Sequence, residues 1–235
     1  MKIAVITGAS SGIGKAIALR LLALNYKVIG ISRTIDNTII TDKNFIPIQT
    51  DLSNTKGVDF TRRELQKYSI SILINSAGMG RFAPHEEFNS KTITEMTFLN
   101  LTAPMLLTNL LLRNLKKNSG YLININSIEA LRASKFSAVY SATKTGLRAF
   151  SDSLFEETRK SELSITNINP DMTQTNFYDK LHFETSKNDD EKLFAEDIAD
   201  VVEHILQMRK GAVISDYTIR ALKFGISKKK LQPNI

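Results

Sequence analysis

Short apolar runs alternate with longer segments of helical periodicity along the whole 235-residue chain. Several runs are apolar at nearly every position, as at 3–6 and 70–74, which is typical of strands buried on both faces of a sheet. The predicted strands span 2–7, 27–32, 45–50, 70–75, 120–126, 163–169 and 212–215, and the predicted helices span 13–25, 57–68, 92–117, 139–162 and 195–209.

This alternation predicts an α/β fold: a doubly wound parallel sheet (Rossmann fold) of about seven strands with helices on both faces. Right-handed crossovers place the ligand crevice beyond the carboxyl ends of the strands. The chain shows neither repeats nor Pro/Gly-rich linkers, so we expect a single domain over residues 1–235.

The formal net charge of +7 is compatible with nucleic acid, an anionic membrane or a phosphorylated small molecule as a partner. Basic residues are spread along the chain, and the dense run at 228–230 is typical of a solvated tail. A basic stripe interleaved with aromatic residues is missing, and no apolar run reaches 18 residues. We therefore expect neither a nucleic-acid nor a membrane partner.

Cysteine is absent from the sequence, which excludes disulfides, thiolate chemistry and cysteine-based metal sites. The three histidines, His85, His182 and His204, show no metal-binding spacing, so no metal is expected. The absence of cysteine is compatible with a reducing compartment, and a cytoplasmic protein is the default prediction.

A glycine-rich segment, Thr7-Gly8-Ala9-Ser10-Ser11-Gly12-Ile13-Gly14, follows the first predicted strand. Gly8 permits a tight turn, Gly12 allows the backbone to approach a pyrophosphate, and Gly14 allows close helix–strand packing. The helix that begins here directs free N–H groups and its positive end toward an anion. A simple turn is the alternative, which the position between strand and helix disfavours. The predicted cofactor-binding residues of this loop are Gly8, Ser10, Ser11, Gly12, Ile13 and Gly14.

The second predicted strand ends in Ile31-Ser32-Arg33. NAD-preferring folds usually place an acidic residue here, whereas this chain carries no carboxylate before Asp36. The hydroxyl of Ser32 and the guanidinium of Arg33 suit a 2′-phosphate. The sequence thus predicts NADP(H) over NAD(H), with Arg33 as the main discriminator; a surface arginine without a role is the alternative.

Tyr140 and Lys144 stand four positions apart on a predicted helix, so their side chains share one face. A nearby cation lowers the pKa of a phenol toward working pH, where it can exchange a proton with a substrate oxygen. Ser127 follows the predicted strand at 120–126, so its hydroxyl is expected at the same edge of the sheet.

Together these features resemble the short-chain dehydrogenase/reductase family, in its single-domain branch. The resemblance covers nearly the whole chain. It rests on Thr7-Gly8-x-x-x-Gly12-x-Gly14, Asp51-Leu52, Asn75-Ser76-Ala77-Gly78, Asn100, Ser127, the Tyr140/Lys144 pair, Asn169-Pro170 and Thr175.

The resemblance implies an oxidoreductase that moves a hydride between a nicotinamide and a carbonyl or alcohol. It implies that Tyr140 is the general acid in reduction and that Lys144 lowers the pKa of Tyr140 and holds the nicotinamide ribose. Ser127 would hydrogen-bond the substrate oxygen. Asn100 matches the family's asparagine that kinks its helix and holds a water; a mere helix cap is the alternative.

For the cofactor, the resemblance implies adenine contacts from Asp51 and Leu52, although Asp51 could also be only a turn residue. Three departures from the family pattern are Ser76, Thr143 and Asp171, the last adding a carboxylate beside the nicotinamide position. The remaining implied contacts are Asn75, Ala77 and Gly78 along the middle of the cofactor, and Pro170 and Thr175 at its carboxamide.

Residues 79–84, 128–136 and 176–183 are expected to wall the substrate pocket, with a lid at about 176–194. The aromatic residues of the lid either enclose an apolar or ring-containing carbonyl or simply pack onto the sheet. Arg81, Glu129 and Arg132 either select a polar end group or lie on the surface. The family pairs the helices predicted at 92–117 and 139–162 across subunits, which implies a homodimer or homotetramer.

NADP(H) dependence favours reduction, so a carbonyl reductase is the leading interpretation. A reductase of 3-oxoacyl thioesters is the alternative within the enzyme class, because a basic surface could receive an acidic carrier protein. A non-catalytic NADP(H)-binding redox sensor and a binder of nucleic acid or anionic surfaces remain as other classes.

Overall fold

The computed structural model describes residues 1–36 and 38–229. Its centre is a seven-stranded sheet in the order β3-β2-β1-β4-β5-β6-β10, and every neighbouring pair is parallel. This confirms the predicted α/β doubly wound fold. The strands are β1 (Ile3–Thr7), β2 (Lys27–Ser32), β3 (Phe45–Gln49), β4 (Ile70–Asn75), β5 (Tyr121–Ile125), β6 (Ser164–Pro170) and β10 (Asp216–Ile219).

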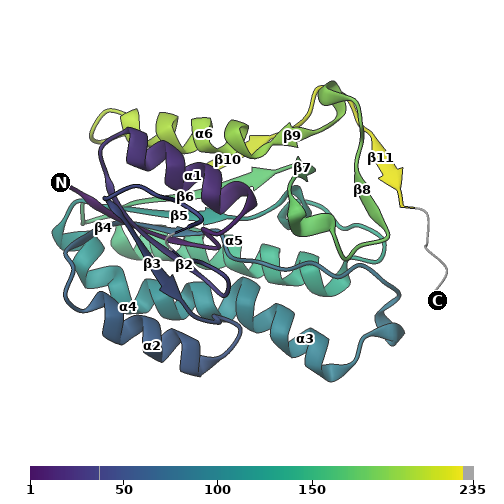
Figure 1. Cartoon of the computed structure of the whole chain (residues 1–235), viewed down its shortest axis with the longest axis horizontal. Helices are drawn as coiled ribbons and strands as arrows, with labels where there is room; N and C mark the ends of the chain where they lie inside the picture. The colour runs from purple at the N-terminus through teal and green to yellow at the C-terminus, as the bar shows by residue number, and fades with distance from the viewer. Residues whose placement is uncertain (37, 230–235) are drawn as a thin grey trace.

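Helices cover both faces of the sheet (Figure 1). On one face lie α1 (Gly12–Ala23) and α6 (Ala195–Gln207), which pack side by side. On the other face lie α2 (Thr55–Leu65), α4 (Ala103–Lys117) and α5 (Ala138–Thr158), while α3 (Ser90–Thr97) precedes α4 and contacts α5.

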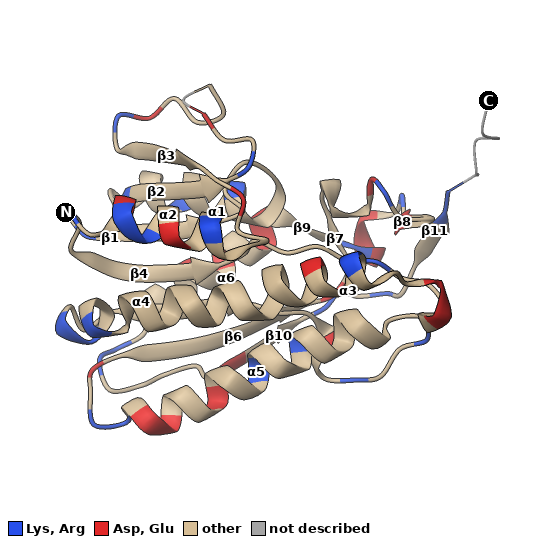
Figure 2. Cartoon of the chain, turned by 90° about the horizontal axis from the view of Figure 1, so that it is seen from below, with Lys and Arg blue, Asp and Glu red and all other residues tan. Residues whose placement is uncertain are grey.

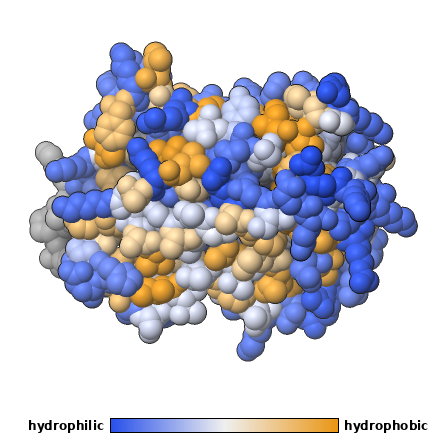
Figure 3. Space-filling view, turned by 180° about the vertical axis from the view of Figure 1, so that it is seen from behind, coloured by the Kyte–Doolittle hydropathy of each residue, from blue (hydrophilic) through white to orange (hydrophobic). Residues whose placement is uncertain are grey.

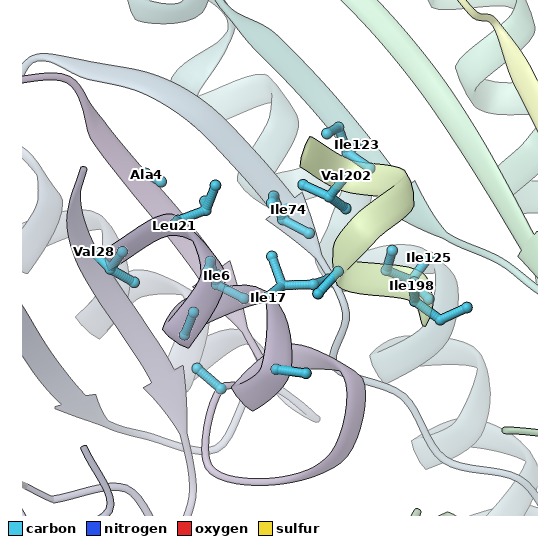
Figure 4. Close-up of a cluster of buried hydrophobic side chains, with 14 of the residues drawn as sticks. Ala4, Ile6, Ile17, Leu21, Val28, Ile74, Ile123, Ile125, Ile198 and Val202 are labelled. Carbon is cyan, nitrogen blue, oxygen red and sulfur yellow. The ribbon is translucent and has the colours of Figure 1, made fainter. Parts of the chain in front are cut away.

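Each helical layer buries its own apolar cluster against the sheet. Figure 4 shows the first cluster, where Ile17 and Leu21 of α1 meet Ile198 and Val202 of α6 above the strands. The second cluster lies under α2, α4 and α5 and includes residues such as Leu107, which is 1% exposed. The continuous apolar runs therefore correctly identified strands that are covered on both faces, such as β4.

The elements differ from the sequence prediction in three places. The last strand of the sheet, β10, covers Asp216–Ile219, so the predicted strand at 212–215 was wrong by about one strand length. The helix predicted at 92–117 is interrupted by a π-helical segment, Phe98–Thr102. Four short strands were not predicted: β7 (Thr173–Gln174), β8 (Phe183–Thr185), β9 (Leu193–Phe194) and β11 (Ile226–Lys228).

The surface mixes charges and apolar residues. Figure 2 shows basic and acidic residues interspersed on the outer faces of the helices, and Figure 3 shows apolar patches separated by hydrophilic residues. Over residues 1–36 and 38–229, no helix is long and apolar enough to span a bilayer, and no group of three or more acidic or histidine side chains is arranged to hold a metal ion. Of the basic run at 228–230, position 230 lies outside the described residues.

Candidate active site

A cavity of about 360 Å³ opens at the carboxyl ends of the central strands. It lies where the chain order reverses, because β1 is followed in sequence by β2 on one side and is flanked by β4 on the other. Such a switch point is the usual ligand crevice of a doubly wound sheet. The cavity is lined by the ends of β1, β2, β4, β5 and β6, so side chains far apart in sequence converge on it.

The glycine-rich loop forms one wall of this cavity. Gly8 and Gly12 have φ angles of 72° and 51°, a region that favours glycine. A Cβ on Gly14 would lie 2.4 Å from the carbonyl oxygen of Gly8, so the close loop–helix contact requires glycine there. Helix α1 begins at Gly12 with Ser11 as an N-cap that makes no side-chain capping bond. The loop thus presents backbone and a helix N-terminus to the cavity, which fits a pyrophosphate.

The end of β2 supplies a cluster of hydroxyls and one cation. The hydroxyls of Ser10 and Ser32 lie 2.8 Å apart, and Thr34 Oγ1 donates to Ser10 Oγ at 3.4 Å. Arg33 is exposed and lines the cavity beside them. The carboxylate of Asp36 accepts hydrogen bonds from the backbone N–H and hydroxyl of Thr38 and is not part of the lining.

Asp51 and Leu52 line the cavity near the end of β3, as expected. Leu52 is buried, and one carboxylate oxygen of Asp51 accepts the N–H of Ser53 at 3.0 Å. Asp51 therefore is a turn residue that also faces the cavity, so the two interpretations are compatible.

Thr7 holds the segment after β4 against the glycine loop. Its hydroxyl accepts the backbone N–H groups of Ser76 and Ala77 at 3.0 and 2.9 Å. Ala77 and Gly78 consequently line the middle of the cavity. The sequence motif contained Thr7, but nothing in it revealed this bridging contact.

Tyr140, Lys144 and Ser127 meet at the far end of the cavity and all three line it. The chain positions the first two on α5 and the third directly after β5. Lys144 Nζ donates to the carbonyl of Ile125 at 2.8 Å and lies 5.8 Å from the centroid of the Tyr140 ring. Ser127 Oγ accepts the N–H of Glu129 at 3.2 Å.

Burial is the largest cause of the pKa shifts of Tyr140 and Lys144. Desolvation raises the pKa of Tyr140 well above its usual value of 10, and the nearby Ser127 hydroxyl opposes that rise. Desolvation also lowers the pKa of Lys144 from 10.5 to about 8. The expected lowering of the phenol pKa by Lys144 is not what this geometry produces, because the loss of solvation around the phenol outweighs the favourable contacts.

Two predicted residues do not reach the cavity but support it from behind. Asn100 is buried in the π-helical segment, where Oδ1 accepts the N–H of Met79 at 2.9 Å and Nδ2 donates to the Met79 carbonyl at 2.8 Å. Asn75 is buried at the end of β4, where Nδ2 donates to Asn124 Oδ1 at 2.7 Å. Asn124 in turn donates to Ser151 of α5 at 2.7 Å. Both asparagines therefore hold the elements that carry the lining residues.

Pro170 and Thr175 also line the cavity. A Cβ on Gly12 would lie 3.0 Å from Thr175 Cγ2, so the two segments are in direct contact. Asp171, the departure from the family pattern, also lines the cavity and pairs with Arg220 at 3.1 Å. The carboxylate of Asp171 is thus paired with Arg220, which directly follows β10.

The three polar candidates for substrate selection lie outside the lining of this cavity. Arg81 is exposed, and Arg132 pairs with Glu129 at 3.5 Å. Glu129 is held by the hydroxyls of Ser134 and Ser141 at 2.8 and 3.1 Å. The structure therefore favours a supporting position for Glu129.

A doubly wound sheet with a phosphate-binding glycine loop and a Tyr/Lys pair across one crevice defines a nicotinamide-dependent oxidoreductase. The short chain dehydrogenase family matches residues 2–185, and the chain belongs to that family. An uncharacterized oxidoreductase of Staphylococcus aureus strain N315 is 31% identical over 228 residues, which cover 93% of this chain and 96% of the relative.

Solved structures share the fold over nearly the full length. The alcohol dehydrogenase from the archaeon Thermococcus sibiricus, complexed with 5-hydroxy-NADP, has a TM-score of 0.85 at 24% identity and covers 94% of this chain and 97% of its own. A 4-hydroxyisoleucine dehydrogenase mutant complexed with NADH and succinate has a TM-score of 0.81 at 25% identity, with 94% and 97% coverage.

Proposed function

We propose that this oxidoreductase uses NADP(H) and acts in the cell as a carbonyl reductase. The observation that carries the proposal is that a single cavity holds Tyr140, Lys144 and Ser127 at one end and Arg33 with its hydroxyl neighbours at the other. The glycine loop between them suits the pyrophosphate that joins the two halves of a dinucleotide.

The nicotinamide, when bound, supplies the hydride that reaches the carbonyl carbon. Tyr140 donates its phenolic proton to the carbonyl oxygen, and the raised pKa of Tyr140 keeps that proton in place at neutral pH. Ser127 donates a hydrogen bond to the same oxygen and stabilises its developing charge. Lys144 would hold the nicotinamide ribose. The products are the alcohol and the oxidised cofactor, and solvent returns the proton to Tyr140.

The preference for NADP(H) rests on the end of β2. The two solved relatives carry an NADP derivative and NADH, so the fold alone does not decide between the cofactors. In this chain Arg33, Ser10, Ser32 and Thr34 offer one cation and three hydroxyls to a 2′-phosphate, and Asp36 is turned toward Thr38. Compared with folds that prefer NAD, this chain has a guanidinium and no lining carboxylate at the end of β2, and both differences favour a phosphorylated ribose.

The remaining predictions extend this proposal. We take residues 176–194 as the lid over the substrate end and residues 1–235 as one cofactor-binding domain. A homo-oligomer and a cytoplasmic location stay predictions; light scattering at micromolar concentration that gave a monomeric mass would contradict the first.

The test is NADPH consumption by the wild type and Tyr140→Phe against a panel of aldehydes, ketones and 3-oxoacyl thioesters. We expect turnover of carbonyl compounds that falls by about 100- to 10,000-fold in the variant, because the proton donor is lost. NADPH binding by calorimetry should be retained in both proteins. Binding without any turnover would refute the reductase and favour a redox sensor; turnover confined to thioesters would favour a carrier-linked reductase.

A further inference from the structure

Five aromatic side chains form a closed cycle at the substrate end of the cavity. Phe82 and Tyr140 have ring centroids 5.2 Å apart, Tyr140 and Phe177 5.9 Å, and Phe177 and Tyr178 5.2 Å. Tyr178 and Phe183 follow at 5.8 Å, and Phe183 returns to Phe82 at 5.3 Å. We call this cycle of Phe82, Tyr140, Phe177, Tyr178 and Phe183 the aromatic box.

The box joins three separate parts of the chain around the proposed proton donor: the segment after β4, helix α5 and the lid. Phe82 follows β4 and Tyr140 is on α5, while Phe177, Tyr178 and Phe183, the first residue of β8, are in the lid. Phe177 and Tyr178 also line the cavity with Tyr140. A substrate whose carbonyl reaches the Tyr140 hydroxyl therefore lies beside Phe177 and Tyr178, while Phe82 and Phe183 support these rings from outside the cavity lining.

Gly80 makes this arrangement of rings sterically feasible. A Cβ at Gly80 would lie 2.4 Å from Phe177 Cζ and 2.9 Å from Phe82 Cε2. The backbone of Gly80 is not in the left-handed region, so glycine is needed here for space and not for conformation. The glycine lets the Phe177 ring lie directly over the loop that precedes Phe82.

The charges around the box are unfavourable for an anionic substrate. Glu129 and Asp171 lie close enough to contribute to the raised pKa values of Tyr140 and Tyr178, respectively. Asp171 is already paired with Arg220 and Glu129 with Arg132. The cation that lines this end of the cavity, Lys144, is buried beneath Tyr140 with its ammonium bonded to Ile125. Among the described residues that line the substrate end of the cavity, a carboxylate on the substrate would thus meet the carboxylate of Asp171, and the ammonium of Lys144 is already bonded to the Ile125 carbonyl.

We propose that the substrate is an uncharged aryl aldehyde or aryl ketone whose ring stacks within the aromatic box. This inference rests on the proposed reductase function and names its substrate class. Aromatic pairs at these separations stabilise each other beyond their apolar area, so a planar ring gains more from the box than a saturated ring of equal size.

The experiment compares matched carbonyl pairs with NADPH: benzaldehyde against cyclohexanecarbaldehyde, and benzaldehyde against 4-carboxybenzaldehyde. We expect kcat/KM to favour the phenyl over the cyclohexyl compound by about 10-fold or more, the size of one or two aromatic contacts. The added carboxylate should lower kcat/KM by a similar factor. Equal values for phenyl and cyclohexyl substrates would overturn the aryl proposal and leave the reductase intact.

Two variants separate the box from general loss of folding. Phe177→Leu keeps an apolar side chain and should bring the phenyl-to-cyclohexyl ratio close to one; Gly80→Ala should do the same by displacing the Phe177 ring. Phe60→Leu is the control, since Phe60 lies on α2, is 38% exposed and belongs to no part of the box. An unchanged ratio in both box variants, with melting temperatures near that of the control, would refute the proposal.

If neither aldehyde is reduced, the aryl specificity is tested by measuring the binding of the corresponding alcohols. Calorimetry of benzyl alcohol and cyclohexylmethanol with the NADP-saturated protein should show tighter binding of the aromatic alcohol, lost in Phe177→Leu. Equal binding of the two alcohols would overturn the aryl specificity, while the absence of turnover would count separately against the proposed reductase.

Discussion

Asn100 and Thr143 link the π-helical segment to the helix that carries Tyr140. Asn100 Nδ2 donates to Thr143 Oγ1 at 3.2 Å, and Thr143 Oγ1 donates to the backbone carbonyl of Tyr140 at 2.7 Å. Both side chains are almost completely buried. The departure from the more common serine at position 143 keeps the hydroxyl and therefore keeps this link.

We expect Thr143→Val to break the link and Thr143→Ser to preserve it. Valine leaves one buried N–H of Asn100 without its partner, which costs about 1–3 kcal/mol and lowers the melting temperature by about 3–10 °C. The measurement is thermal unfolding together with kcat for NADPH-dependent reduction. A Val variant as stable and active as the Ser variant would show that the hydroxyl has no positioning role.

Arg33→Ala should shift the cofactor preference. Loss of a charged hydrogen-bond donor to a phosphate should lower kcat/KM for NADPH by about 10- to 100-fold. The value for NADH, which lacks that phosphate, should change little. Arg132→Ala is the matched control, because Arg132 is a partly exposed arginine outside the cavity lining. An unchanged NADPH/NADH ratio in Arg33→Ala would remove Arg33 from the proposed cofactor site.

Lys144 should make the free energy of unfolding depend on pH between about 8 and 10.5. The unfolded chain protonates this lysine below about pH 10.5, whereas the buried lysine of the folded state stays neutral down to about pH 8. Stability is consequently lost as the pH falls from 10.5 to 8, by about 3 kcal/mol, and this loss then stays constant below pH 8.

Lys144→Met removes the charge and with it this dependence. We expect the melting temperature of the cofactor-free wild type to rise relative to Lys144→Met as the pH increases from 8 to 10.5. Lys91→Met is the control, because Lys91 is exposed on α3. Its melting temperature should change with pH in parallel with that of the wild type. Parallel curves for all three proteins would mean that the pKa of Lys144 is not lowered in the folded state.

Lys229 should hold the lid from the C-terminal side. Lys229 Nζ donates to the carbonyls of Tyr178 and Asp179 at 2.5 and 3.2 Å, while β11 pairs with β8 in antiparallel register. We expect Lys229→Ala to raise KM for the carbonyl substrate several-fold, with KM for NADPH nearly unchanged, and to speed proteolysis near residues 178–180. The neighbouring Lys228→Ala, at an exposed position of the same strand, should leave all three measurements at wild-type values.

The parallel sheet was predictable because its apolar runs are local signals. The position of β10 was not, since its first residue is charged. Asp216 enters the sheet because its carboxylate accepts hydrogen bonds from Asn169 and Arg148 at 2.6 and 2.7 Å. These partners are 47 and 68 residues away, so no periodicity near residue 216 could reveal them.

The candidate site likewise contains residues that the sequence predicts and contacts that it does not. Residues fixed by a local motif, such as Gly12 and Tyr140, line the cavity as expected. Asn100 was assigned by a motif that implies a kinked helix, and the π-helical segment lies at that position, but the contacts of Asn100 with Met79 could not be read from the sequence. The aromatic box could not be predicted either, because its rings meet through a lid whose strands, β8 and β9, are three and two residues long and form only by tertiary pairing.

The aromatic box also ties the acidity of Tyr140 to the position of the lid. Phe177 and Phe82 cover the phenol, and desolvation is the largest cause of its raised pKa. Any movement that readmits water to the phenol must therefore lower that pKa. Thermodynamic linkage makes the effect reciprocal: ionising Tyr140 favours the open lid by the same free energy.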